Sequence, residues 1–289
     1  MCGKISEYYP YDPHAGAERV QRVKDSSECL VREQGERRVC SCKIESGQKS
    51  DMLIVKKFGG SSVANKERIF RVAERCIEEY KKGNDVVVVL SAMGDTTDEL
   101  LAKAADINPN APKRELDMLL TTGEQVSVSL MAMAMHALGV PAVSLNAYQV
   151  MMHSTSRYGN ARFKRIDSER IRHELDSRKI VIVTGFQGVN KYDDYTTLGR
   201  GGSDFSAVLF ADMLELKEVE IYTDVDGVYD SDPKLHEFAL RYDHLSYDEM
   251  LNMKSRVLHD RCVEYAKQHH IEIYLKGTFS KGAGTLISS

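Results

Sequence analysis

The stretch Leu53-Ile-Val-Lys-Lys-Phe-Gly-Gly-Ser-Ser-Val-Ala-Asn65 decides the fold of this chain. Its apolar start, Leu53 to Val55, predicts a short buried strand with Lys57 at the C-terminal end. Gly59 and Gly60 then end the strand and let the backbone approach a ligand closely, because no Cβ stands in the way. The candidate N-caps of the helix that follows are Ser61, Ser62 and Asn65. A strand, a glycine turn and a helix N-terminus beside a lysine together predict an anion site.

The same stretch is also compatible with an ordinary strand–helix turn that carries a surface lysine. It lacks the G-x-x-x-x-G-K-[ST] pattern of a Walker P-loop and the G-x-G-x-x-G pattern of a Rossmann dinucleotide site. The classes of phosphate-binding protein that depend on those two loops are therefore excluded. Only the other motifs of the chain can decide between an anion site and an ordinary turn.

The composition is that of a globular protein with one large α/β domain or two small ones: 289 residues, of which 42% are hydrophobic and 28% charged. The formal net charge of −4 indicates no general attraction to nucleic acid. No run approaches the roughly 18 consecutive apolar residues of a membrane span, and the N-terminus lacks an apolar signal segment. Only Cys76 and Cys262 lie beyond residue 51, which favours a reduced, cytoplasmic protein.

Residues 1–51 differ in composition from the rest of the chain. They are rich in Arg, Glu, Lys and Ser and poor in large aliphatic residues, so we expect a mobile or loosely helical N-terminal extension. Their cysteines do not form a convincing zinc site, because the close pair Cys40-x-Cys42 lacks the usual C-x₂₋₄-C spacing. The sequence therefore predicts an extension over residues 1–51 and a folded domain over residues 52–289.

Helical and strand patterns alternate beyond the opening stretch. Apolar residues at helical spacing predict a helix from Asn65 to Lys82, and the β-branched run Val86–Leu90 is typical of a strand that is buried on both faces. Further buried strands are expected at Val140–Leu145, Ile180–Thr184, Val219–Tyr222, Ile271–Leu275 and Thr285–Ile287. This alternation predicts an α/β fold whose sheet is mostly parallel and covered on both faces.

Polar segments near the predicted strands could supply a small-molecule site. The hydroxyl-rich loop Ser91–Asp98 follows the Val86–Leu90 strand at its C-terminal end, where open α/β sheets bind ligands. A long helix is expected from Arg114 to Leu138, and within it Glu124 interrupts the apolar pattern. A glutamate in a stretch otherwise bound for the core needs a partner, although in isolation such a segment is more often a solvated turn.

The densest motif is Thr197-Leu-Gly-Arg-Gly-Gly-Ser-Asp204, just before a helix expected over Ser203–Leu214. Arg200 can hold a carboxylate with two parallel hydrogen bonds, which a lysine cannot do. Asp204 stands at the helix start, where it can hold a lysine in place. The plainer alternative is a glycine-rich turn with an N-cap.

These motifs resemble those of the aspartate kinases, in the amino-acid kinase superfamily. The resemblance covers about residues 52–289. It implies the amino-acid kinase fold, an open αβα sandwich whose N-terminal half binds the phosphoryl acceptor and whose C-terminal half binds ATP. The matching segments are Lys57-Phe-Gly-Gly-Ser-Ser-Val-Ala64, Thr121-Thr-Gly-Glu-Gln125, Tyr158-Gly-Asn-Ala-Arg162, Leu198-Gly-Arg-Gly-Gly-Ser-Asp204 and Thr223-Asp-Val-Asp-Gly-Val-Tyr-Asp-Ser-Asp-Pro-Lys234.

The resemblance implies phosphoryl transfer from ATP to the β-carboxylate of L-aspartate, giving 4-phospho-L-aspartate at the start of lysine, threonine and methionine biosynthesis. Mg²⁺ is implied as a metal that ATP carries, with no ligands from the protein. Lys57 and Asp204 are the implied catalytic residues. The residues implied in aspartate binding are Ser91, Thr97, Glu124, Arg200 and Ser203. The residues implied in nucleotide binding are Lys57, Gly59, Gly60, Ser61, Thr223, Asp224, Tyr229, Lys234 and Arg256.

Two of these residues depart from the family pattern. Lys234 stands where relatives usually have arginine, so the positive charge is kept but the bidentate fork is lost. Arg256 stands where relatives usually have a lysine beside the nucleotide phosphates. The printed sequence ends at Ser289, before the two ACT modules that relatives usually carry, so we expect no regulatory module in it.

Two alternatives to an aspartate kinase stay open. One is a kinase of the same fold that acts on another small acceptor, such as glutamate, acetylglutamate or a nucleoside monophosphate. The other is a catalytically weak homologue that binds aspartate or nucleotide as a regulatory partner. The sequence leaves a homodimer open and predicts no nucleic-acid or membrane partner.

Overall fold

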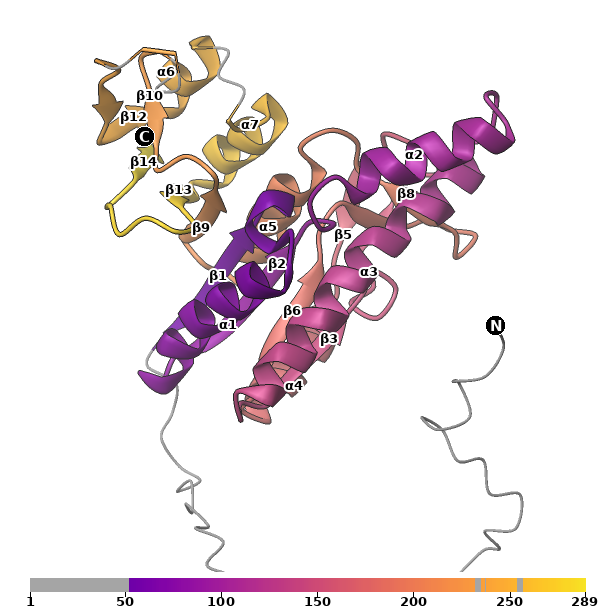
Figure 1. Cartoon of the computed structure of the whole chain (residues 1–289), viewed down its shortest axis with the longest axis horizontal. Helices are drawn as coiled ribbons and strands as arrows, with labels where there is room; N and C mark the ends of the chain where they lie inside the picture. The colour runs from indigo at the N-terminus through magenta and orange to yellow at the C-terminus, as the bar shows by residue number, and fades with distance from the viewer. Residues whose placement is uncertain (1–51, 232–234, 237, 254–256) are drawn as a thin grey trace, which may run out of the picture. The chain divides into compact units, whose positions relative to one another are not determined.

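The computed structural model describes residues 52–231, 235–236, 238–253 and 257–289. Its main element is an eight-stranded sheet in which every pair of neighbouring strands is parallel except β13 and β14. The mostly parallel sheet expected from the sequence is thus confirmed (Figure 1). In spatial order the strands are β12 (His244–Ser246), β14 (Thr285–Ser288), β13 (Glu272–Gly277), β9 (Glu218–Thr223), β1 (Leu53–Phe58), β2 (Asp85–Leu90), β6 (Ile180–Thr184) and β3 (Ala142–Leu145).

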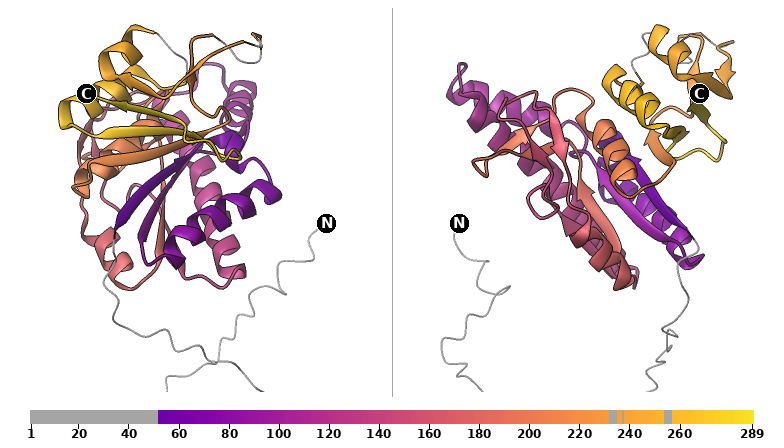
Figure 2. Two further views of the ribbon diagram at one scale, coloured as in Figure 1. Left: turned by 90° about the vertical axis from the view of Figure 1, so that its left-hand side faces the viewer. Right: turned by 180° about the vertical axis from the view of Figure 1, so that it is seen from behind.

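Helices cover both faces of this sheet, as an αβα sandwich requires (Figures 1 and 2). One face packs against α1 (Lys66–Lys81) and α3 (Lys113–Ala137), which also contact each other. A further helix, α2 (Thr96–Ile107), packs on α3 and contributes no buried residue. The opposite face packs against α4 (Glu169–Asp176), α5 (Gly202–Met213), α6 (Tyr247–Asn252) and α7 (Asp260–His269).

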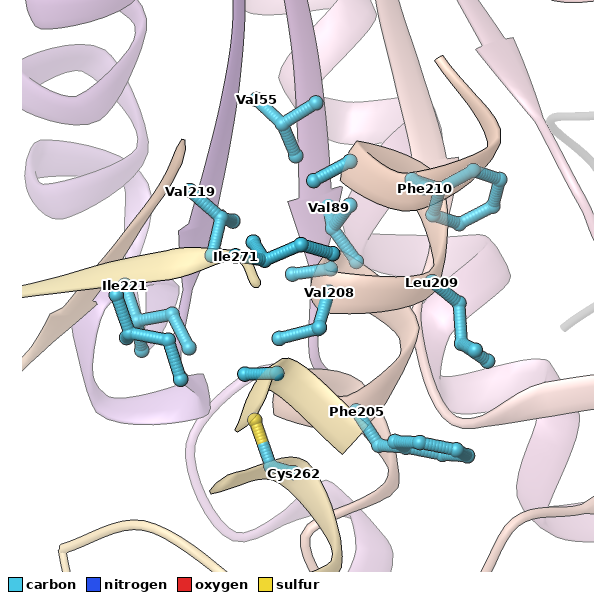
Figure 3. Packing of buried hydrophobic residues seen from close by; sticks show 14 of the residues in the cluster. Val55, Val89, Phe205, Val208, Leu209, Phe210, Val219, Ile221, Cys262 and Ile271 are labelled. Atoms are coloured by element: carbon cyan, nitrogen blue, oxygen red, sulfur yellow. The ribbon is translucent and has the colours of Figure 1, made fainter. Parts of the chain in front are cut away.

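Alternation along the central strands explains how one sheet serves two cores. In β2, Val87 and Val89 point into the core under α5, while Val86 and Val88 point into the core under α1 and α3. All four are fully buried, so the continuous run of valines reflects a strand that has no solvent-facing side. Figure 3 shows the first of these cores, where residues of β1, β2 and β9 meet Phe205, Val208, Leu209 and Phe210 of α5.

Two smaller sheets lie outside the main one, and the sequence patterns did not predict them. Their strands are only two or three residues long, too short to show a period of two. The larger sheet has the order β5 (Phe163–Arg165), β4 (His153–Ser154), β7 (Gln187–Val189) and β8 (Tyr195–Thr197). The smaller one pairs β10 (Val228–Tyr229) with β11 (Arg241–Tyr242).

The turn after β1 differs in part from the prediction. Residues Gly60–Val63 form a short 3₁₀ helix, and α1 begins only after Asn65, whose side chain accepts a hydrogen bond from the Arg68 N–H. Asn65 is therefore the cap, and the expectation that Ser61 or Ser62 caps this helix is wrong. The Ser62 hydroxyl is buried and lies 2.6 Å from the Thr278 hydroxyl.

The segment around Glu124 is helical throughout. The predicted break in the apolar pattern is present in the sequence, but α3 runs without interruption from Lys113 to Ala137. Glu124 lies within this helix and is 3% exposed, so the alternative of a solvated turn is wrong. Across the described part of the chain, no helix combines the length and the apolar character that crossing a membrane would require.

The order of the strands places a switch point at β1. On one side of β1 the sheet continues through β2, β6 and β3, and on the other side it continues through β9 and β13. In open α/β sheets, ligands bind beyond the carboxyl ends of the strands at such a point. The residue at this position in β1 is Lys57, followed by Phe58 and the glycine turn.

Candidate active site

Two pockets lie beyond the carboxyl ends of the parallel strands. The first is about 250 Å³ in volume and lies beyond β1, β2 and β6; we call it the Lys57 pocket. The second is about 320 Å³ and lies beyond β9 and β13; we call it the Thr223 pocket. Within the first group of strands, β1 is the one that neighbours β9, so Lys57 lines the Lys57 pocket on the side that borders the Thr223 pocket.

The Lys57 pocket brings together every residue that the sequence analysis assigned to acceptor binding or catalysis. These residues come from the ends of β1 and β2, from α2, from the middle of α3 and from the start of α5. They are Lys57, Ser91, Thr97, Glu124, Arg200, Ser203 and Asp204. The sequence analysis missed other lining residues, which are Ala92, Gly94, Phe186, Gly199, Gly201 and Gly202. Phe186 follows β6 at its carboxyl end, so the rule that selected Ser91 after β2 could have found it.

Lys57 forms an ion pair with Asp204. Its Nζ lies 2.5 Å from Asp204 Oδ1, and both side chains are largely buried. Alternation along β1 sends Lys56 to the opposite face, where its Nζ pairs with Glu220. The pairing predicted between Lys57 and Asp204 is thus present, and it fixes the ammonium group at the pocket wall.

Glu124 is the most unusual charged group in the Lys57 pocket. Its Oε1 accepts a hydrogen bond from the Ala92 N–H at 3.2 Å, while its Oε2 is buried and has no hydrogen-bond partner among the described residues. Burial raises the pKa of Glu124 to about 7. A buried carboxylate oxygen without a partner in a pocket wall is well suited to a cationic ligand group.

Glycines allow the walls of this pocket to approach each other. A Cβ at Gly60 would lie 2.6 Å from the Ala92 carbonyl oxygen, and the Gly94 N–H donates to the Gly60 carbonyl oxygen at 2.9 Å. A Cβ at Gly123 would lie 2.9 Å from the Ala92 Cβ. Close contact between α3 and the loop after β2 therefore depends on Gly123, and this contact brings Glu124 to the Ala92 N–H.

Replacing Gly123 with alanine should lower the free energy of unfolding. Alanine in place of glycine within a helix ordinarily stabilises it by up to ~1 kcal/mol, but here the new methyl group would overlap Ala92 and cost about 1–3 kcal/mol. Urea unfolding measures the difference, and the double variant Gly123→Ala/Ala92→Gly should recover most of the loss. A Gly123→Ala protein more stable than the unchanged one would show that the two segments do not depend on close contact.

The Thr223 pocket contains three of the residues predicted to bind nucleotide. Thr223, Asp224 and Tyr229 line it, and the Tyr229 hydroxyl donates to Asp226 at 2.6 Å. The sequence analysis missed its other lining residues, which are Val225, Asp226, Gly277, Thr278, Phe279 and Ser280. Val225 and Asp226 follow β9, Gly277 is the last residue of β13, and the other three follow β13. The carboxyl ends of the two strands lie side by side, so adjacency in the sheet brings these residues to one pocket.

Thr278 links this pocket to the turn after β1. Its N–H and its hydroxyl both donate to the Thr223 carbonyl oxygen, at 2.9 and 3.0 Å. The same hydroxyl lies 2.6 Å from the Ser62 hydroxyl. Ser62, which the sequence analysis treated only as a candidate cap, therefore connects the turn after β1 to the Thr223 pocket through Thr278.

Four residues predicted to bind nucleotide are not placed at a pocket by the described structure. The Gly59 N–H donates to the Tyr222 carbonyl oxygen at 3.2 Å, so it continues the sheet and does not face an anion, contrary to the expectation. Ser61 lines neither pocket and presents its carbonyl oxygen to Arg68. Lys234 and Arg256 lie outside the described residues. Gly60 lines the Lys57 pocket instead of the Thr223 pocket.

Within the described ranges, no group of three or more His, Cys, Asp and Glu side chains is arranged to hold a metal ion.

Comparison with known proteins matches residues 52–277 to the model of the amino acid kinase family. The chain is 50% identical over 238 residues to the aspartokinase of Bacillus sp. (strain MGA3), which covers 81% of this chain and 58% of the relative. The solved aspartate kinase from Synechocystis superposes with a TM-score of 0.74 at 42% identity, over 82% of this chain and 40% of that one.

A second solved structure, Escherichia coli aspartokinase III in complex with aspartate and ADP, superposes with a TM-score of 0.71 at 25% identity. The match covers 82% of this chain and 64% of that one. The chain printed here spans little more than half the length of the curated aspartokinases that it matches.

Proposed function

The chain belongs to the amino acid kinase family, and on this basis we propose that it is an aspartate kinase, which transfers the γ-phosphoryl group of ATP to the β-carboxylate of L-aspartate. The observation that carries the proposal is the buried Glu124 carboxylate in the Lys57 pocket, with one oxygen unpartnered. The similarity to aspartokinases at 50% identity supports the same assignment.

In this proposal the Lys57 pocket binds the α-ammonium and the α-carboxylate groups of aspartate. The unpartnered Glu124 oxygen accepts hydrogen bonds from the substrate ammonium, which removes the cost of leaving a buried charge unpaired. Arg200, on the exposed loop before α5, binds the α-carboxylate through its planar guanidinium. The hydroxyl groups that complete the pocket are those of Ser91, Thr97 and Ser203.

ATP, with the Mg²⁺ that it carries, occupies the Thr223 pocket and extends its γ-phosphate toward Lys57. Tyr229 and Phe279 provide the aromatic surface of that pocket, and Thr223 and Asp224 provide its polar groups. Because Lys57 lines its pocket on the side that borders the Thr223 pocket, a phosphoryl group that passes between the two pockets passes its ammonium group. The bound Mg²⁺ contributes further neutralisation of the phosphate charge.

The chemistry needs no general base, because a carboxylate is already ionised at neutral pH. The β-carboxylate oxygen attacks the γ-phosphorus, an O–P bond forms, and the bond from that phosphorus to the bridging oxygen of ADP breaks. What the protein has to supply is alignment and stabilisation of the charge on the transferred group. Lys57 supplies a positive charge in a fixed position, because Asp204 holds its ammonium group.

A coupled assay of ADP release tests the proposal. With ATP and Mg²⁺ present, L-aspartate should stimulate ADP release, and equal concentrations of L-glutamate, acetylglutamate or UMP should not. Stimulation by one of these other acceptors would assign the chain to a different kinase of the same fold. Calorimetric binding of aspartate without turnover would identify a binding protein instead of an enzyme.

Aspartate affinity should increase with pH between about pH 6 and pH 8. Glu124 has a pKa of about 7 in the ligand-free protein, and the substrate ammonium favours its ionised form. Below that pKa, binding has to remove a proton first, so the association constant falls by up to about tenfold per pH unit; above it, the constant levels off. The aspartate carboxylates do not titrate in this range, and the adjacent α-carboxylate raises the pKa of the free amino acid's ammonium group above it.

Isothermal titration calorimetry across this range measures the effect. The matched variant Glu124→Gln should bind aspartate weakly and with no pH dependence, because the amide does not titrate. If the unchanged protein binds aspartate equally well throughout the range, Glu124 is not the group that holds the ammonium.

A further inference from the structure

A second buried carboxylate lies on the helix that carries Glu124. Asp117 is 1% exposed and precedes Glu124 on α3 by about two helical turns. It lines neither the Lys57 pocket nor the Thr223 pocket. A carboxylate is seldom buried to this extent unless its oxygens are fully hydrogen-bonded, because the lost hydration must be replaced.

The partners of Asp117 come from two segments far away in the sequence. The Gly159 N–H donates to both carboxylate oxygens, at 3.1 and 2.9 Å. The Thr197 N–H donates to Oδ2 at 3.0 Å, and the Thr197 hydroxyl donates to Oδ1 at 2.8 Å. One side chain thus joins the N-terminal part of α3 to residue 159 and to the last residue of β8.

One of these segments leads into the Lys57 pocket, and the other lies against it: a Cβ at Gly199 would lie 3.1 Å from Asn160 Oδ1. Thr197 is followed directly by the Leu198–Asp204 loop, which contains Arg200. Gly159 belongs to the Tyr158–Arg162 segment, which matched the family motifs but received no role. The two segments are also joined to each other, because the Ala161 N–H donates to the Thr197 carbonyl oxygen at 2.8 Å. The two segments therefore form one unit, and Asp117 joins this unit to α3. The Arg114–Asp194 ion pair and the Gln187 side chain, which donates to the Thr121 carbonyl oxygen at 2.6 Å, join neighbouring parts of the unit to the same helix.

We propose that Asp117 is a positioning residue of the acceptor site. It fixes the Leu198–Asp204 loop so that Arg200 and Glu124 stand at the separation that the α-carboxylate and the α-ammonium of the substrate require. The proposal rests on the proposed function, since it takes Glu124 and Arg200 as the groups that bind aspartate. Asp117 does not touch the substrate. It acts because Glu124 and Asp117 share one helix, while the exposed Arg200 follows Thr197 by three residues on the loop before α5.

A purely structural role for Asp117 predicts a different outcome. If the carboxylate only supports the fold, its loss should weaken binding at both pockets and lower stability in general. If it positions the Arg200 loop, its loss should weaken aspartate binding and leave the Thr223 pocket intact. The residues of that pocket follow β9 and β13, on the other side of β1 from α3 and β8.

The hydrogen-bond donors that contact Asp117 allow a matched pair of substitutions, one that keeps an acceptor and one that removes it. In Asp117→Asn, the amide oxygen can accept from the Gly159 and Thr197 N–H groups, while the amide nitrogen donates to the Thr197 hydroxyl, which can reverse and accept. In Asp117→Leu, a side chain of similar size accepts nothing and leaves these donors unpaired. Thr197→Val in the Asp117→Asn background removes the hydroxyl on which the rescue depends.

Calorimetry on the full chain tests the proposal, with Glu115→Gln as the control on an exposed position of the same helix. Asp117→Leu should weaken aspartate binding about tenfold or more, as expected when buried donors lose their acceptor, and leave the ADP dissociation constant unchanged. Asp117→Asn should restore most of the affinity, and Thr197→Val should abolish that rescue. Equal losses for aspartate and ADP, or an unchanged aspartate affinity in Asp117→Leu, would overturn the proposal.

Amide hydrogen exchange separates this proposal from the proposed function. In Asp117→Leu, the amides of residues 158–162 and 197–201 should exchange faster, while those of β9 and β13 keep the rates of the unchanged protein. If the unchanged chain binds no aspartate, the proposed function fails, and faster exchange confined to these two segments still supports the positioning role. Unchanged exchange there would overturn it.

Discussion

Replacing Lys57 with alanine should lower the turnover number about 100- to 1,000-fold, the usual cost of losing one preorganised electrostatic group. The ammonium group lines the Lys57 pocket and is held by Asp204 at 2.5 Å. The other cation that lines this pocket, Arg200, is assigned to the α-carboxylate of aspartate. The Michaelis constant for aspartate should change little, because Glu124 and Arg200 remain. Steady-state rates of ADP release at saturating aspartate and ATP measure the effect.

The matched control for this prediction is Lys56→Ala, on the same strand. Lys56 lies on the opposite face, where it pairs with Glu220 and contacts Tyr222. Its loss should lower the melting temperature, because a buried ion pair is broken, and should leave the turnover of the folded protein close to that of the unchanged chain. Near-normal turnover in Lys57→Ala, or equal losses in the two variants, would remove Lys57 from the mechanism.

Replacing Arg200 with lysine should raise the Michaelis constant for aspartate about ten- to a hundredfold, even though the charge is kept. A guanidinium binds a carboxylate through two parallel hydrogen bonds, while an ammonium offers a single point of contact. Hydrogen bonds to charged groups contribute roughly 1.5–3 kcal/mol each, which corresponds to this range. The turnover number at saturating aspartate should fall much less, because Lys57 and the Thr223 pocket are unaffected.

Arg172→Lys, at an exposed position on α4, controls for any general effect of replacing an arginine with a lysine. It should leave the kinetic constants for both substrates unchanged. An Arg200→Lys protein that saturates with aspartate at the original concentration would show that Arg200 does not bind the α-carboxylate, and another cation would have to take that role.

The main sheet could be predicted from the sequence because burial on two faces leaves a strong pattern. The valine run of β2 has no solvent-facing position, and Val55 in the apolar start of β1 is buried as well, so the strand character of these runs is strongly marked. The small sheet that contains β4 and β8 could not be predicted in this way. Its strands are short, and several of the residues that pair across it are polar, such as Gln187 opposite Thr197, so no apolar alternation marks them.

The grouping of Lys57, Arg200 and Asp204 in one pocket could be predicted from their motifs, whereas the assignment of Ser91, Thr97 and Glu124 rested on the resemblance to the aspartate kinases. Arg200 and Asp204 share one glycine-rich loop, and Lys57 stands beside two glycines. What the motifs could not provide was the pairing between distant segments. Phe186 reaches the Lys57 pocket only because β6 lies beside β2, and Asp117 reaches Thr197 only because α3 packs along β8.

The turn after β1 shows where local rules mislead. Serine after a glycine pair is a frequent helix cap, but here a 3₁₀ turn delays the helix to Asn65. The Ser62 hydroxyl then reaches Thr278, which is 216 positions away in the chain. The Gly59 N–H donates to the Tyr222 carbonyl oxygen and so continues the sheet. Both contacts come from β9 and β13, which no local pattern near residue 60 could reveal.

The identity of the phosphorylated product tests the central claim most directly. When the chain is incubated with ATP, Mg²⁺ and L-aspartate, ³¹P NMR should show an acyl phosphate, and added hydroxylamine should convert it to the β-hydroxamate of aspartate while releasing inorganic phosphate. The Lys57→Ala protein should form this product at a rate lower by two orders of magnitude or more. Release of ADP without an acyl phosphate, or a phosphate signal that hydroxylamine does not remove, would contradict phosphoryl transfer to the aspartate carboxylate.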